Sequence, residues 1–126
     1  MEQLIAHLFG DYVLQSDWMA LGKRKSFGVA AIHALTYGLP FALLHPSLLA
    51  WFVIVVTHAL IDHFAVARYV SFAKNWLAPP SMWIPWEKTN ATGYSEEKAI
   101  WMSTWLFIIT DNALHLAINY AALRWL

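Results

Sequence analysis

The chain has 126 residues, of which 60% are hydrophobic and only 13% are charged, whereas soluble domains average about 45–50% apolar and about 25% charged residues. A soluble fold this small cannot bury so much apolar surface, so the composition argues against a soluble monomer and against a disordered chain. Eight basic residues balance eight acidic residues, which argues against nucleic-acid binding, and the absence of cysteine excludes disulfides and thiolate metal sites.

The eight tryptophans indicate an integral membrane protein, because tryptophan concentrates at membrane–water interfaces. Four apolar stretches follow one another along the chain: residues 4–21, 27–44, 48–70 and 100–123. Each has about 18–24 residues, enough for a helix to cross a hydrocarbon core of about 30 Å. The sequence therefore predicts an all-α integral membrane protein, a single domain over residues 1–126 with four transmembrane helices in a bundle.

The first stretch is the least hydrophobic and is predicted to be a polar-lined spanning helix. It lacks a basic start and a small-residue cleavage site, so a signal peptide is not expected.

The connections between the stretches predict the topology. Residues 22–26 contain three basic residues, residues 45–47 contain none, and the long connection over residues 71–99 contains three more. Basic residues favour the cytoplasmic side, and placing the first and third connections inside puts seven of the eight basic residues there, counting Arg68 at the inner end of the third stretch. This predicts a bacterial inner-membrane protein with both termini on the outer, periplasmic face.

Within the long connection, residues 76–86 read WLAPPSMWIPW. Three prolines forbid a long regular helix, and the tryptophans favour a segment that lies in the inner membrane interface. The first interpretation is an interfacial anchor, and the alternative is a lid or lipid entrance for a site between the helices.

Ionisable pairs recur inside the predicted spans with a spacing of four residues. They are His7–Asp11, His58–Asp62 and Asp111–His115, and the second span carries His33 with Tyr37 four residues later. Residues four apart share one helix face. We count residues from the basic residue at the cytoplasmic end of each predicted span, at about 1.5 Å per residue. All four sets then lie at a depth of about 12–20 Å, near the bilayer midplane.

The cost of burying these groups points to a metal. A midplane aspartate costs about 2.5–3.5 kcal/mol on insertion scales, so three unpaired ones would cost roughly 8–10 kcal/mol. A divalent metal offsets this cost, with zinc as the first choice and manganese or iron as alternatives. The predicted ligands are His7, Asp11, His33, His58, Asp62, Asp111 and His115.

Seven groups exceed the needs of one tetrahedral metal, so either two metals bind or some groups orient the ligands. The alternative without metal is a set of hydrogen bonds between helices.

Further residues have predicted roles around this site. Asp11, Asp62 or Asp111, when not a ligand, could act as the general base. Gln15 continues the His7–Asp11 face and could bind either substrate or the groups that orient the ligands. His63 points about 100° away from its neighbour Asp62 and is a weaker candidate. Lys23 and Lys25 are interpreted first as topology determinants, with contact to a phosphate as the alternative.

The ordered set HLFGDYVLQSDWMALGKRK, His33, THALIDHFAVAR and TDNALH resembles a family of small integral membrane proteins of unknown function from bacteria and their phages. The family pattern is HxxxDxxxQ, a pair of histidines on the second helix, THxxID, and then DQxxH, which becomes D[QN]xxH when this chain is included; the resemblance covers nearly the whole chain. The chain is also similar, more distantly, to membrane-bound metal-dependent hydrolases. The chain departs at Tyr37, where the family has a second histidine, and at Asn112, where it has glutamine. The first departure removes one ligand.

Four functions remain open at this point. The first is a metal-dependent hydrolase acting on a lipid or a lipid-linked phosphate, with membrane lipid as its surroundings and no nucleic-acid partner. The alternatives are proton or metal-ion transport or sensing, haem ligation by facing histidines, and a non-enzymatic phage or bacterial protein that interacts with the cell envelope. The oligomeric state does not follow from the sequence.

Overall fold

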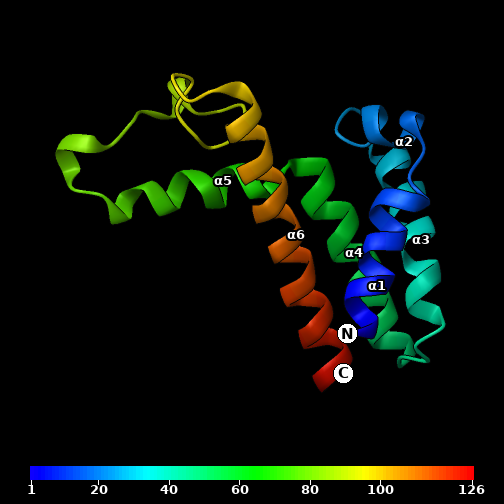
Figure 1. The fold of residues 1–126 in the computed structure, drawn as a ribbon. Coiled ribbons are helices and arrows are strands. Elements are labelled where there is room, and N and C mark those ends of the chain that lie inside the picture. The colour runs from blue at the N-terminus through cyan, green and yellow to red at the C-terminus, as the bar shows by residue number, and fades with distance from the viewer. The chain divides into compact units, whose positions relative to one another are not determined.

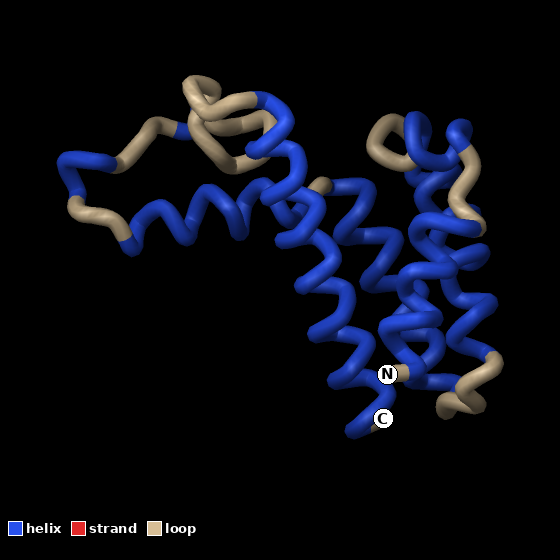
Figure 2. The backbone as a smooth tube through the Cα atoms, in the orientation of Figure 1, coloured by secondary structure: helices blue, strands red, loops and turns tan.

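The computed structural model describes residues 1–126 and consists of helices and connecting loops without strands (Figures 1 and 2). The α-helices are α1 (Glu2–Leu8), α2 (Asp17–Gly22), α3 (Phe27–Ala42), α4 (Leu48–Phe64), α5 (Val66–Ala73) and α6 (Ile100–Trp125). The shorter segments are the π-helical turn η1 (Phe9–Val13) and the 3₁₀ turns η2 (Lys74–Leu77), η3 (Pro80–Met82) and η4 (Trp86–Lys88). The prediction of an all-α fold is confirmed.

The chain forms two compact units. The first comprises Met1–Phe64 with His115–Leu126, and the second comprises Ala65–Leu114. In the first unit α3 packs against α4 and also against α1 and η1 (Figure 1). The apolar core of this unit centres on the fully buried side chains of Tyr37, Phe41 and Ile54.

The predicted first span, residues 4–21, is not one helix. The amide of Leu14 donates to the carbonyl of Phe9 at 2.9 Å, an i to i+5 bond that defines the π turn η1. The chain then leaves the helix, and α2 starts afresh at Ser16, whose Oγ accepts from the amide of Met19 at 3.3 Å. A serine N-cap followed by an aspartate in the first turn stabilises a new helix start, which explains the break.

The prediction of four spans is also wrong in its number. Helices α3 and α4 have 16 and 17 residues, fewer than the roughly 20 that a membrane crossing needs. The third predicted stretch is interrupted at Ala65, whose φ of +49° is left-handed and ends α4. One helix, α6 with 26 residues, is long and apolar enough to span, or two spans result if α4 and the segment Val66–Leu77 count as one broken span.

The second unit contains the long connection, which runs through three 3₁₀ turns and, as expected from its three prolines, forms no long regular helix over residues 76–86. Gly93 has a φ of +81°, and a Cβ there would lie 2.1 Å from the carbonyl oxygen of Arg68, so only glycine lets the loop pack on α5. The ring of Trp86 stacks on Tyr69 with centroids 5.1 Å apart. The loop is thus folded onto α5, and its location at a membrane interface stays a prediction.

A buried tyrosine in this unit is held by polar neighbours. Burial raises the pKa of the Tyr94 hydroxyl, but side-chain hydrogen bonds with Lys74, Thr110 and Ser71 outweigh burial and lower its pKa overall. Lys74 donates through Nζ to the Tyr94 oxygen, so the phenolate form is stabilised by an adjacent positive charge.

Candidate metal centre

The close approach of η1 to α3 depends on Gly10. A Cβ at this position would lie 2.6 Å from Cδ2 and 2.9 Å from the carbonyl oxygen of Tyr37. These distances are shorter than side chains tolerate, so only glycine allows the π turn to lie directly on α3. The next residue, Asp11, therefore reaches the side chain of His33 one turn earlier on α3.

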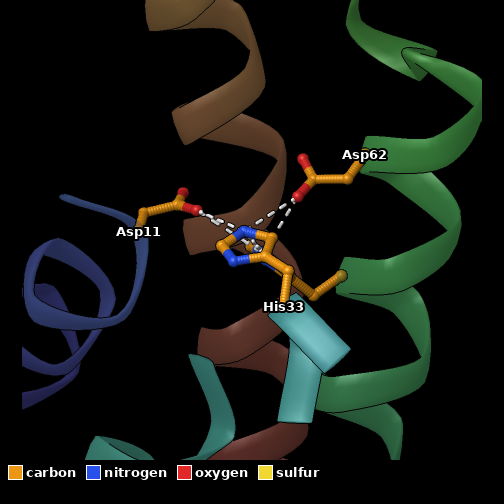
Figure 3. A group of neighbouring side chains, drawn as sticks. Asp11, His33 and Asp62 are labelled. Atoms are coloured by element: carbon orange, nitrogen blue, oxygen red, sulfur yellow. Dashed lines mark hydrogen bonds and ion pairs between the residues drawn. The ribbon is translucent and has the colours of Figure 1, made fainter. Parts of the chain in front are cut away.

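The other two residues of the site come from α4. His58 and Asp62 are four residues apart and share one face of this helix. That face meets α3, where His33 Nε2 lies 3.0 Å from His58 Nε2 and 3.1 Å from Asp62 Oδ2. Figure 3 shows Asp11 and Asp62 pointing toward His33 from opposite sides.

Together these four residues, Asp11, His33, His58 and Asp62, form the His/Asp cluster. All four are buried, with whole-residue exposures between 0% and 6%. Asp11 Oδ1 lies 3.2 Å from His33 Nε2 and 3.5 Å from His58 Nε2, and His58 Nε2 lies 3.2 Å from Asp62 Oδ2. One ligand atom from each residue lies within 4.8 Å of all the others.

These separations match the dimensions of a tetrahedral metal site. Zinc binds histidine nitrogen at about 2.0–2.1 Å and carboxylate oxygen at about 2.0–2.2 Å, so adjacent ligand atoms in a tetrahedron lie about 3.3–3.5 Å apart. The measured pairs span 3.0–3.5 Å. The cluster therefore has the residue types, the burial and the spacing to hold a divalent metal ion.

Lys23 adds a positive charge at the edge of the cluster. Its Nζ lies 2.9 Å from Asp62 Oδ2 and 3.4 Å from His33 Nε2. The backbone of Lys23 is fixed as well, since His63 Nδ1 donates to its carbonyl oxygen at 2.9 Å. His115 approaches the other oxygen of Asp62, with Nε2 at 3.5 Å from Oδ1.

A buried polar chain continues from Asp11 on the other side. His7 Nε2 lies 3.8 Å from Asp11 Oδ2, and His7 Nδ1 lies 2.9 Å from the hydroxyl of Tyr37. Asn119 donates to this hydroxyl at 2.6 Å, so the hydroxyl proton can go to His7. The ring of Tyr37 also stacks on His58 at 3.6 Å, which fixes the plane of that imidazole.

The predicted site residues thus fall into three groups: those that form the cluster, those that contact its carboxylates, and Asp111 and Gln15, which are in neither group. Asp11, His33, His58 and Asp62 form the cluster, and His7 and His115 each contact one of its carboxylates. Asp111 is half-buried on α6, one turn before His115, and belongs to the second compact unit. Gln15 is half-buried in the break between η1 and α2. Which of these residues bind metal stays a prediction.

Two contributors were not predicted. From the sequence, Lys23 is interpreted first as a topology determinant, with contact to a phosphate as the alternative. Its contact with Asp62 could not be read from the sequence because it depends on how the α2–α3 connection folds. Asn119 was missed although a signal existed: it lies four residues after His115 and so continues the face of α6 that carries His115.

The helices and the cluster define a small all-α protein with a candidate metal centre. The chain belongs to the family described as Protein of unknown function (DUF3307), whose profile matches residues 1–124. No curated protein and no solved structure matches the chain. The expectation of a family of unknown function that covers nearly the whole chain is confirmed, and the more distant resemblance to metal-dependent hydrolases stays a prediction.

Proposed function

We propose that this protein is a membrane-embedded, metal-dependent hydrolase that acts on a lipid or a lipid-linked phosphate. The single observation that carries the proposal is the convergence of four buried ligand atoms from Asp11, His33, His58 and Asp62. Zinc is the preferred metal, with manganese or iron as alternatives, because two imidazoles and carboxylate oxygens suit all three.

Three of the four residues are proposed as ligands. His33 Nε2, His58 Nε2 and Asp62 Oδ2 form the tightest triangle, with edges of 3.0, 3.1 and 3.2 Å. Two histidines and one carboxylate are a ligand set of catalytic zinc sites, which keep the fourth position open for water or substrate. Asp11 Oδ1 faces the two histidine nitrogens at 3.2 and 3.5 Å and is proposed as the general base.

The chemistry follows from these roles. A bound dication lowers the pKa of water to about 7 and polarises a phosphoryl or carbonyl oxygen. In this proposal Asp11 would take the proton of the attacking water, and His7, whose Nδ1 lies at the Tyr37 hydroxyl, would orient the Asp11 carboxylate. His115 at Oδ1 and Lys23 at Oδ2 would orient the Asp62 carboxylate as His7 would orient that of Asp11.

The exposed apolar surface supports a location in a membrane. Only 22% of the most apolar stretch of α6 is buried, whereas the core helix of a soluble protein is mostly buried, and α6 is far from the N-terminus where signal sequences lie. Leu77 and Leu48 are 91% and 83% exposed, and large exposed apolar surfaces mark membrane or partner contacts. The bacterial inner membrane with both termini outside is part of this proposal.

An apolar pocket supports the choice of a lipid substrate. It has a volume of about 780 Å³ and lies between the N-terminal segment and the end of α3, lined by residues such as Ile5, Phe9, Leu39 and Leu43. A pocket of this size with almost wholly apolar walls suits a hydrocarbon chain.

The test separates ligand from base. The protein is purified in detergent without chelator, its metal is measured by mass spectrometry, and phosphate release from phosphatidic acid and polyprenyl phosphates is assayed. Asp62→Asn should lose the metal, whereas Asp11→Asn should keep it and lose roughly 10²–10⁴-fold in rate. Asp17→Asn, an exposed aspartate in α2, is the control. A wild-type protein without stoichiometric metal, or full activity in Asp11→Asn, would refute the proposal.

A second candidate is proton or metal-ion transport, and the buried polar chain favours it. The chain leads from the cluster through Asp11 and His7 to the Tyr37 hydroxyl and Asn119. Chains of such groups carry protons in membrane proteins. Proton or zinc flux into proteoliposomes that disappears in Tyr37→Phe would support transport, and flux unchanged in both Tyr37→Phe and Asp62→Asn would exclude it.

A further inference from the structure

The ammonium group of Lys23 is the part of the site that the proposed ligand and base roles leave unused. Its side chain is 17% exposed, whereas the side chains of Asp11, His33 and Asp62 are 8%, 0% and 3% exposed. Lys23 therefore lies at the rim of the His/Asp cluster, between its buried ligand atoms and the surroundings.

The contacts of Lys23 leave hydrogen-bonding capacity. An ammonium group carries three N–H donors. The ammonium forms an ion pair with Asp62 Oδ2 at 2.9 Å, which engages one of these N–H groups. His33 Nε2, at 3.4 Å, cannot accept from Lys23 once its lone pair binds a metal. Two N–H groups thus remain for an acceptor that comes from outside the protein.

Contacts from two directions fix the position of Lys23, so its remaining N–H groups stay beside Asp62. Asp62 holds the ammonium, and the neighbouring residue His63 donates through Nδ1 to the Lys23 carbonyl at 2.9 Å. His63 is itself packed edge-on against Phe27, the first residue of α3, at 5.5 Å. The connection between α2 and α3 is thereby tied to α4 directly beside the cluster.

We infer that Lys23 binds a phosphate-type oxyanion at the edge of the metal centre, and that His63 is the residue that positions Lys23 for this task. The inference rests on the proposed metal centre and deepens it: it assigns to the substrate or product a tetrahedral phosphate group. An oxyanion held by the ammonium lies beside Asp62 and His33, the residues that face the metal position. A lysine ammonium binds phosphate as a point charge with charge-assisted hydrogen bonds.

The test uses the full chain in detergent, loaded with zinc, and inorganic phosphate as the probe in titration calorimetry. Lys23→Gln should weaken phosphate binding about 10- to 100-fold, the loss expected for one charge-assisted hydrogen bond, and should keep its zinc. Lys25→Gln, an exposed lysine two residues on, is the matched control and should change the affinity by less than about twofold.

His63→Leu is the second variant. It retains the Lys23 ammonium, so it tests the inference even if Lys23→Gln fails to fold. It should weaken phosphate binding about 3- to 10-fold with unchanged zinc content, the loss expected for one hydrogen bond between uncharged groups. Equal phosphate affinity in wild type, Lys23→Gln and His63→Leu, all with zinc bound, would overturn the inference and leave the metal centre intact. A wild-type protein that takes up no zinc would overturn both.

A second arm separates free phosphate from a lipid headgroup. The protein is placed in nanodiscs of phosphatidylcholine with or without phosphatidic acid, and the phosphate titration is repeated. Competition by phosphatidic acid that disappears in Lys23→Gln assigns the site to a lipid phosphomonoester, and phosphate binding without competition assigns it to free phosphate. Competition that persists equally in Lys23→Gln would contradict the inference.

Discussion

The contact between η1 and α3 at Gly10 gives the sharpest test of how the site is built. In Gly10→Ala the new methyl group would lie 2.6 Å from the ring and 2.9 Å from the carbonyl oxygen of Tyr37. Ordinary contacts begin at 3.4 Å, so η1 must move away by roughly 0.5–1 Å. Asp11 Oδ1, now 3.2 Å from His33 Nε2, would leave hydrogen-bonding range.

The expected cost follows from two opposing effects. Overpacking costs about 1–3 kcal/mol, and replacing a helical glycine by alanine returns about 0.5–1 kcal/mol. We therefore expect a net loss of about 1 kcal/mol, and at most about 2.5 kcal/mol, in the free energy of unfolding. If Asp11 is a ligand, zinc affinity should fall as well. If Asp11 is the base, affinity should change little and the hydrolysis rate should drop.

Thermal unfolding and zinc titration of the purified protein measure both effects. The matched control is Gly28→Ala in the first turn of α3, where the added Cβ would meet its nearest neighbour, Ser26 Oγ, at an ordinary 3.6 Å. It should be neutral or stabilising by up to about 1 kcal/mol. If Gly10→Ala is as stable as Gly28→Ala and keeps its zinc affinity and rate, the assigned packing of η1 on α3 is wrong.

Three further outcomes are expected. Tyr37→Phe removes the hydroxyl that His7 and Asn119 contact, so it should cost about 1–3 kcal/mol in thermal unfolding while mass spectrometry still finds the metal, and loss of the metal would contradict this. Stripping the metal with a chelator should lower the unfolding free energy by about 2.7 kcal/mol relative to protein at 100 times its zinc dissociation constant, and an unchanged melting curve would count against a bound metal. Tyr94 has a lowered pKa, so its contribution to stability is present at high pH and is lost as the pH falls through the folded-state pKa; Lys74→Met should raise that pKa in an ultraviolet titration measured against Tyr94→Phe, and no change would refute the pairing.

The candidate site was largely predictable because of helix periodicity. Residues four apart share a face, so His58 and Asp62 on α4 could be assigned together from spacing alone, and the structure keeps them on one face. Spacing does not reveal which faces meet. That His33 contacts both Asp11 and Asp62, and that Lys23 reaches the same carboxylate of Asp62, depends on contacts between residues 22 to 39 positions apart.

The helix boundaries were harder to predict. Apolar composition made residues 4–21 and 48–70 look continuous, because hydropathy averages over a window and does not detect a single residue that ends a helix. The N-cap at Ser16 restarts the first segment, and the left-handed Ala65 ends α4. Alanine is a good helix former, so no local preference marks position 65 as a break.

The sequence by itself determined that the protein is helical, strongly apolar and equipped with histidine and aspartate pairs on single helix faces, since composition and period are properties of the chain alone. Only the tertiary structure decided that four of these residues form one cluster, that Gly10 lets Asp11 reach it, and that Lys23 and Asn119 belong to its surroundings. The physical reason is that a binding site is defined by distances between segments remote in sequence. Those distances are set by how closely the backbones can pack.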